Sequence, residues 1–159
     1  MALKSDRYEA QTDVSFFYNA GTATRGGVVV LDAANASGVA LDQGVNLVKY
    51  AAVSATSVPV GILLNDVVDK DLTRTHLNWF KDEVQKGGKV TVLTQGWVVT
   101  SNIDGNPTPG QTAYASSGVA GNLTAVSAVG RAHAVGKFMT NKDADGYAKV
   151  YVNLPNFGS

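Results

Sequence analysis

The hydrophobic residues of this chain fall in short runs that alternate with polar residues. In the run 148–154, Val150 and Val152 lie on one face, whereas Lys149 and Tyr151 lie on the other. A period of two is typical of a β-strand with one buried face. Similar runs, most of them rich in valine and bounded by turn residues, predict further strands. The predicted strands span residues 14–18, 27–31, 47–53, 58–64, 89–93, 97–101, 112–115, 123–128, 131–140 and 148–154.

One segment departs from this period. Within residues 71–86, Leu72, Phe80 and Val84 are spaced close to a helical repeat, and Gly87 follows as a stop signal. This pattern favours a short helix, or a long loop that contains one or two helical turns.

The chain has 159 residues, the length of one domain. Residues 1–13 show little apolar periodicity, and we expect them to form an extended N-terminal arm or a frayed end. Residues 14–159 then form a single β-rich domain.

A weak internal repeat lies within this domain. Residues 59–66 resemble residues 134–141, each containing Val-Gly near its start. The repeat predicts two related modules, at about 14–101 and 108–159, with an insertion at 66–87 in the first. An insertion projects from the shared scaffold, where functional residues are often found.

The composition agrees with a β protein. The chain contains 23 valines but only 2 glutamates, so it is rich in strand formers and poor in residues that suit exposed helix faces. We therefore expect an all-β fold, a compact barrel-like or tulip-like body of short antiparallel strands with one short helical insertion. The net charge is zero, which argues against a strongly basic nucleic-acid binder.

The residues suited to catalysis or metal binding are few. The chain has no cysteine and only two histidines, His76 and His133. Residues 141–146 match part of a calcium-binding loop, but Val152 occupies the position that requires a bidentate glutamate, so a hairpin turn is the better interpretation. We predict no catalytic, cofactor or metal site, and no small-molecule substrate.

Membrane and nucleic-acid partners are also not expected. The apolar run 50–64 is too short to span a bilayer. The basic residues near Trp79 and Phe80 are interleaved with aspartates and glutamate, which cancel most of the attraction to phosphate. These aromatic residues either cap one end of the body or form a protein interface.

Several blocks of the sequence, taken in order, resemble the head decoration (cement) proteins of tailed bacteriophages, the group that includes the lambda-type decoration protein. The blocks are residues 13–19, 25–31, 58–67, 86–99, 108–114, 129–136 and 145–154.

This resemblance implies a structural protein without enzymatic activity. Such proteins typically form homotrimers on the outer surface of the mature virion capsid, after assembly in the host cytoplasm, and clamp the major capsid protein against the pressure of packaged DNA. In lambda-type members an N-terminal arm orders on binding and pairs with coat-protein backbone, as residues 1–13 could do here by strand addition.

The expected capsid or subunit interface combines the N-terminal region with the insertion. Its residues are Leu3, Tyr8, Val14, Phe16, Phe17, Arg74, His76, Trp79 and Phe80. Two alternatives remain at this stage: a phage tail or fibre β-module, and a small enzyme with a site around His133 or His76.

Overall fold

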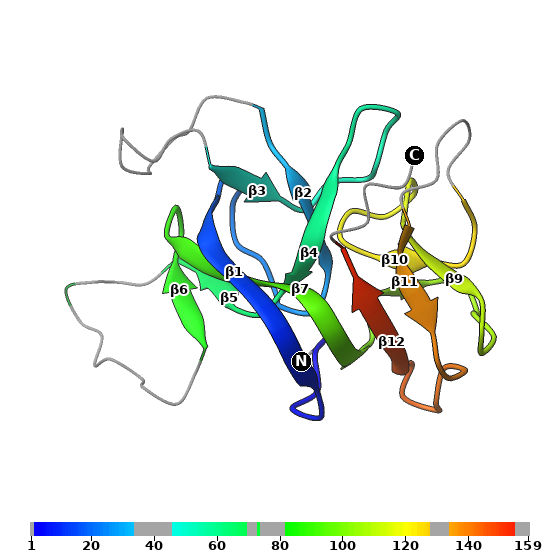
Figure 1. Ribbon diagram of the computed structural model, residues 1–159. Coiled ribbons are helices and arrows are strands. Elements are labelled where there is room, and N and C mark those ends of the chain that lie inside the picture. Colours follow the sequence, from blue (N-terminus) through cyan, green and yellow to red (C-terminus); the bar gives the residue numbers. More distant parts are fainter. Residues whose placement is uncertain (1, 34–45, 70–72, 74–81, 128–133, 155–159) are drawn as a thin grey trace.

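The computed structural model describes residues 2–33, 46–69, 73, 82–127 and 134–154, and these contain strands, turns and no helix (Figure 1). The all-β class expected from the sequence is therefore confirmed. The strands are β1 (Tyr8–Tyr18), β2 (Val28–Leu31), β3 (Leu47–Lys49), β4 (Pro59–Leu63), β5 (Asp66–Val68), β6 (Glu83–Gln85), β7 (Lys89–Thr100), β8 (Ile103–Asp104), β9 (Thr112–Ala115), β10 (Leu123–Thr124), β11 (Ala134–Phe138) and β12 (Ala148–Asn153).

Ten of these strands form one large sheet. Their order is β1-β3-β2-β4-β7-β12-β11-β9-β10-β8, and β1 also pairs with β7. The five strands β1, β3, β2, β4 and β7 are thus joined in a closed circuit of pairings. Most pairings are antiparallel, but β1–β3 and β8–β10 are parallel, as is the separate β5–β6 pair. The antiparallel arrangement expected from the sequence thus holds for most pairings, and these three pairs depart from it.

The two halves of the large sheet have the same internal order. In β1-β3-β2-β4-β7 and in β8-β10-β9-β11-β12, the first and third strands along the chain are parallel and the other neighbours are antiparallel. The last strands of the two halves, β7 and β12, pair with each other at the centre. The repeat seen in the sequence falls on β4 and β11, which occupy equivalent places.

A glycine holds the same position in these two equivalent strands. Gly61 lies opposite Val29 and Gly136 lies opposite Ala113, each beside a register shift in the ladder. A β-carbon on Gly61 would lie 2.3 Å from the Leu93 carbonyl oxygen, and one on Gly136 would lie 1.7 Å from that of Tyr151. Both glycines are therefore needed where a neighbouring backbone passes too close for any side chain.

The longest strand, β7, joins two runs that the sequence separated. Residues 89–93 and 97–101 were expected as distinct strands. The structure instead places Gly96 inside β7, opposite Glu9, with a φ of 146°. The register of β1 shifts beside it, so Gly96 supports a β-bulge within one continuous strand.

The expected helical insertion was wrong in the part that the structure describes. Glu83–Gln85, the end of the expected helix, is strand β6 and pairs in parallel with β5. Residues 70–72 and 74–81 lie outside the described residues. The helical spacing of Val84 misled because β5 offers backbone partners that no local pattern reveals.

The N-terminal residues pack along the body. Strand β1 begins at Tyr8, so the predicted boundary at Val14 falls inside a continuous strand. Before it, Leu3 forms a bridge with Thr100 and is 1% exposed. The amide of Lys4 donates to the Val99 carbonyl. Leu3 thus anchors this segment by burial, although the few apolar residues before β1 give no periodic signal.

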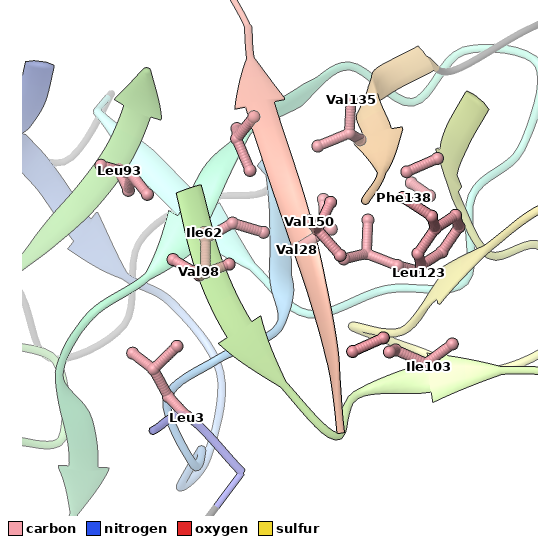
Figure 2. Packing of buried hydrophobic residues seen from close by; sticks show 14 of the residues in the cluster. Leu3, Val28, Ile62, Leu93, Val98, Ile103, Leu123, Val135, Phe138 and Val150 are labelled. Atoms are coloured by element: carbon pink, nitrogen blue, oxygen red, sulfur yellow. The ribbon is translucent and has the colours of Figure 1, made fainter. Parts of the chain in front are cut away.

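The core consists of two groups of buried apolar residues. The larger group lies between the two halves of the sheet, where Figure 2 shows Val98 of β7 and Val150 of β12 near Ile62 and Phe138. The smaller group gathers around Tyr18 inside the circuit of five strands. Strand β7 contributes side chains to both groups and so connects the two halves.

We predict that Leu3→Ala lowers the free energy of unfolding by about 2–5 kcal/mol, because it leaves a cavity in the larger core group. Val14→Ala, at a side chain 55% exposed, is the control and should change stability by less than about 0.5 kcal/mol. Urea denaturation measures both. Equal, small effects would show that Leu3 does not anchor the N-terminal segment.

We also predict that Gly96→Ala destabilises the fold by about 3 kcal/mol or more, because its β-carbon would lie 1.9 Å from the Tyr8 carbonyl oxygen. Gly105 also has a positive φ, of 82°, but a β-carbon on Gly105 would meet no atom within 4 Å. Gly105→Ala should therefore cost only about 1–2 kcal/mol of backbone strain. Denaturant midpoints that fall equally in both variants would contradict a steric role for Gly96.

Candidate functional site

The predicted interface residues that the structure describes are found in two different environments. Tyr8 and Val14 on β1 are 57% and 55% exposed. Phe16 is partly buried against the smaller core group, and the centre of the Phe17 ring lies 5.8 Å from the Lys89 ammonium. Leu3 is buried in the core. Tyr8 and Val14 are therefore available to a partner, whereas Leu3 is not.

The remaining predicted residues come from the insertion. Arg74, His76, Trp79 and Phe80 lie outside the described residues, as does His133. Their expected role at an interface stays a prediction.

Strand β1 lies at an open edge for most of its length. One edge pairs with β7 from Tyr8 to Phe17, whereas the other edge pairs with β3 only at Phe17 and Tyr18. Over residues 8–16 no described strand pairs with this second edge. Backbone groups at such an edge can accept an additional strand from another chain.

Bulges shape this edge. Val14 and Ser15 lie between the paired residues Asp13 and Phe16, where the register shifts, and the Ser15 amide donates to Asp13 Oδ1 at 2.8 Å. The Val14 side chain at this bulge is exposed to solvent. Bulges also discourage uncontrolled strand addition, so a partner at this edge must match its shape.

A charged network surrounds the start of β1. Arg25 Nη1 lies 2.8 Å from Asp82 Oδ2, and Arg7 binds both Glu9 and, at 3.8 Å, Asp82. The amide of Arg25 donates to Asp66 Oδ1. These bonds border an open hollow of about 550 Å³ and tie the N-terminal segment to the β5–β6 sheet.

Sequence reasoning missed an aromatic row that begins at Tyr8. Tyr8 lies opposite Trp97 of β7, and Trp97 lies opposite Tyr151 of β12. The Lys149 ammonium lies 3.9 Å from the centre of the Trp97 ring. The alternation of Tyr151 with buried valines signalled an outward face, but only the register between strands brings these rings into one row.

The turn that joins β11 and β12 is held by one carboxylate. Asp143 Oδ1 accepts hydrogen bonds from the amides of Tyr147 and Asp145, and Asp143 Oδ2 lies 3.3 Å from the Lys4 ammonium. The bond from the Tyr147 amide, followed by Lys4, lowers the pKa of Asp143 below its ordinary value of 3.8. Gly146, with a φ of 87°, completes the hairpin predicted for this segment.

Among the described residues, few side chains are arranged for catalysis or metal binding. They contain no group of three or more side chains arranged to hold a metal ion. Burial raises the pKa of Tyr50, whose hydroxyl donates to the Thr24 carbonyl and accepts from the Gly27 amide, a structural arrangement. No helix among the same residues is long and apolar enough to cross a membrane. The surface features above are edges and faces suited to protein contacts.

These features define an all-β protein whose accessible sites are contact surfaces. The family model of the structural cement proteins (E217 gp24/Pam3 gp6) matches residues 8–153, from the first residue of β1 to the last residue of β12. The chain belongs to this phage cement family and is a structural protein of the virion capsid, which confirms the resemblance found in the sequence. A comparison with curated proteins gives no match.

We predict that Asp143→Asn flattens the dependence of stability on acid pH. Because the folded-state pKa is lowered, the carboxylate stabilises the fold above its unfolded-state pKa, and this contribution is lost as the pH falls through the folded-state value. Urea midpoints between about pH 6 and pH 2 measure the effect. Asp145→Asn, in the same turn, is the control and should keep the wild-type profile; identical profiles for both variants would refute the prediction.

Proposed function

We propose that this cement protein binds the outer surface of the mature, expanded capsid and reinforces it against the pressure of packaged DNA. The partner is the major capsid protein, and the protein acts as a homotrimer without catalytic activity. Membership of the cement family supports a capsid-binding role. Assembly onto shells takes place in the host cytoplasm.

The observation that carries this proposal is the open edge of β1. Over residues 8–16 the strand is already held by β7, and its second edge has no described strand partner. A coat-protein segment that adds here gains backbone hydrogen bonds without the need to order β1 itself. Ordering a free arm would cost roughly 1–2 kcal/mol per residue. The packed N-terminal segment avoids most of that cost.

Two exposed side chains supply selectivity at this edge. Tyr8 and Val14 lie toward opposite ends of the open stretch and are both more than half exposed. The bulge at Val14 sets where a partner strand must begin or end. Phe16, which packs partly against the smaller core group, supports the strand from beneath.

A trimer increases the strength of this attachment. Three copies held together bind three neighbouring coat subunits, and the second and third contacts become intramolecular. Weak individual contacts then suffice to clamp adjacent subunits. The zero net charge of the chain permits close packing of identical copies without strong repulsion.

Co-sedimentation with shells of the same phage tests the proposal. Saturable binding near one copy per coat subunit, on expanded shells and not on unexpanded ones, is the expected result. An absence of binding to both forms would overturn it. Cross-linking of the bound protein, followed by mass determination, tests the trimer.

We predict that Val14→Asp weakens binding to expanded shells by about tenfold or more, because it places an unpaired charge against the added strand. Val126→Asp is the matched control: Val126 is 74% exposed and lies far along the chain, after β10. It should bind as the wild type does. Thermal unfolding of both variants verifies that the fold is intact, and equal shell binding by both would exclude the β1 edge.

A further inference from the structure

A second surface continues from the β1 edge across the outer face of the sheet. The cross-strand row of Tyr8, Trp97 and Tyr151 extends to Lys137 of β11 and then to Thr112 of β9. Residues directly opposite one another in neighbouring strands share a face. The row therefore spans five adjacent strands, and β12, β11 and β9 lie side by side in Figure 1.

The side of the sheet on which this row lies follows from the buried residues. Val98 and Val150 point into the core in Figure 2 and are each 0% exposed. Their neighbours Trp97 and Tyr151 consequently point away from the core. Tyr151 is 43% exposed and so presents its ring to solvent on this face.

A groove lies at the far end of the row. It has a volume of about 440 Å³ and a mainly apolar lining. Ala134 and Gly136 have little or no side chain and so leave space for the groove. Tyr151 and the half-exposed Met139 also line it. The small floor residues, the ring and the flexible thioether together suit an inserted apolar side chain.

The groove end of this face is positively charged, whereas acidic side chains lie beside Tyr8 at the other end. Lys137 lines the groove, and Lys149 lies over Trp97 on the next strand. None of the residues that line the groove is acidic. Within the described part of the chain neither lysine has a carboxylate partner. A partner that lies along the row would therefore meet two ammonium groups beside apolar surface.

We propose that this face, from Tyr8 to the groove, binds an acidic segment of the capsid protein that places one apolar side chain in the groove. The inference rests on the proposed function and names the chemistry of the partner. Carboxylates of the segment pair with Lys137 and Lys149, and its apolar side chain packs against Tyr151. The face is continuous with the open β1 edge at Tyr8, so one coat-protein segment can engage both.

The charge contacts orient this partner on the face more than they contribute to its affinity. Exposed ion pairs contribute little to affinity and are screened by salt, whereas a buried apolar anchor dominates. The arrangement therefore predicts a salt-dependent contribution from the lysines and a largely salt-independent one from Tyr151.

Shell binding by charge variants provides the first test. At about 50 mM salt, Lys137→Glu should weaken binding to expanded shells about threefold to tenfold, because it replaces an attraction with a repulsion, and at about 500 mM salt most of this loss should disappear. Lys86→Glu is the matched control, because Lys86 is also exposed but lies beside β6, away from the groove. Tyr151→Ala should weaken binding by the same factor at both salt concentrations.

The inference is overturned if Lys137→Glu binds shells as tightly as Lys86→Glu and circular dichroism shows that both variants are folded. The proposed function would remain intact in that case. If wild-type protein itself fails to bind shells, the proposed function fails first. The two failures are thus distinguishable.

A photo-cross-linking residue in place of Met139 identifies the occupant of the groove on assembled shells. A product with the coat protein, joined at an acidic segment, supports the inference. A product with a second copy of this chain overturns it in favour of a contact within the trimer, and an absence of products overturns it as well. A cross-linker in place of Val126 controls for random contact.

Discussion

The structure depends on the backbone pairing of one long strand. β7 joins β4 and β1 through its first half and β12 and β1 through its second, so both halves of the sheet are attached to it. Its alternation places the adjacent residues Val92 and Leu93 in the two different core groups. Gly96 lets β1 approach closely at the point where the circuit of five strands meets the second half. A change that separated β1 from β7 would open the circuit and release Leu3 from the core.

The same pairing also creates the surfaces available to a partner. Because β7 holds one edge of β1, the other edge has no partner strand among the described residues from Tyr8 to Phe16. Because β7 and β12 are in register, Trp97 and Tyr151 become neighbours on the outer face. Under the proposed function, attachment through strands that are themselves tied to the central strand carries a load between coat subunits directly into the sheet.

Much of the fold could be predicted from local patterns. Strands such as β4, β9, β11 and β12 follow the expected runs closely, because alternation and turn residues are local properties. The errors share one cause, which is that a partner distant in the sequence decided the outcome. Glu83–Gln85 became a strand because β5 pairs with it, and Gly96 continued a strand because β1 passes beside it. The repeated half-sheet topology appeared in the sequence only as the similarity between β4 and β11.

Some features of the candidate site could likewise be predicted from the sequence, whereas others required the tertiary structure. The sequence by itself determined the family, the scarcity of catalytic residues, and Tyr8 and Val14 as candidate contacts, since these follow from residue types and their order. Only the tertiary structure decided that Leu3 is buried, that the edge of β1 is open, and that a lysine-flanked aromatic row leads to a groove. The reason is physical: burial and cross-strand register arise from contacts between residues far apart in the chain, which no local period records.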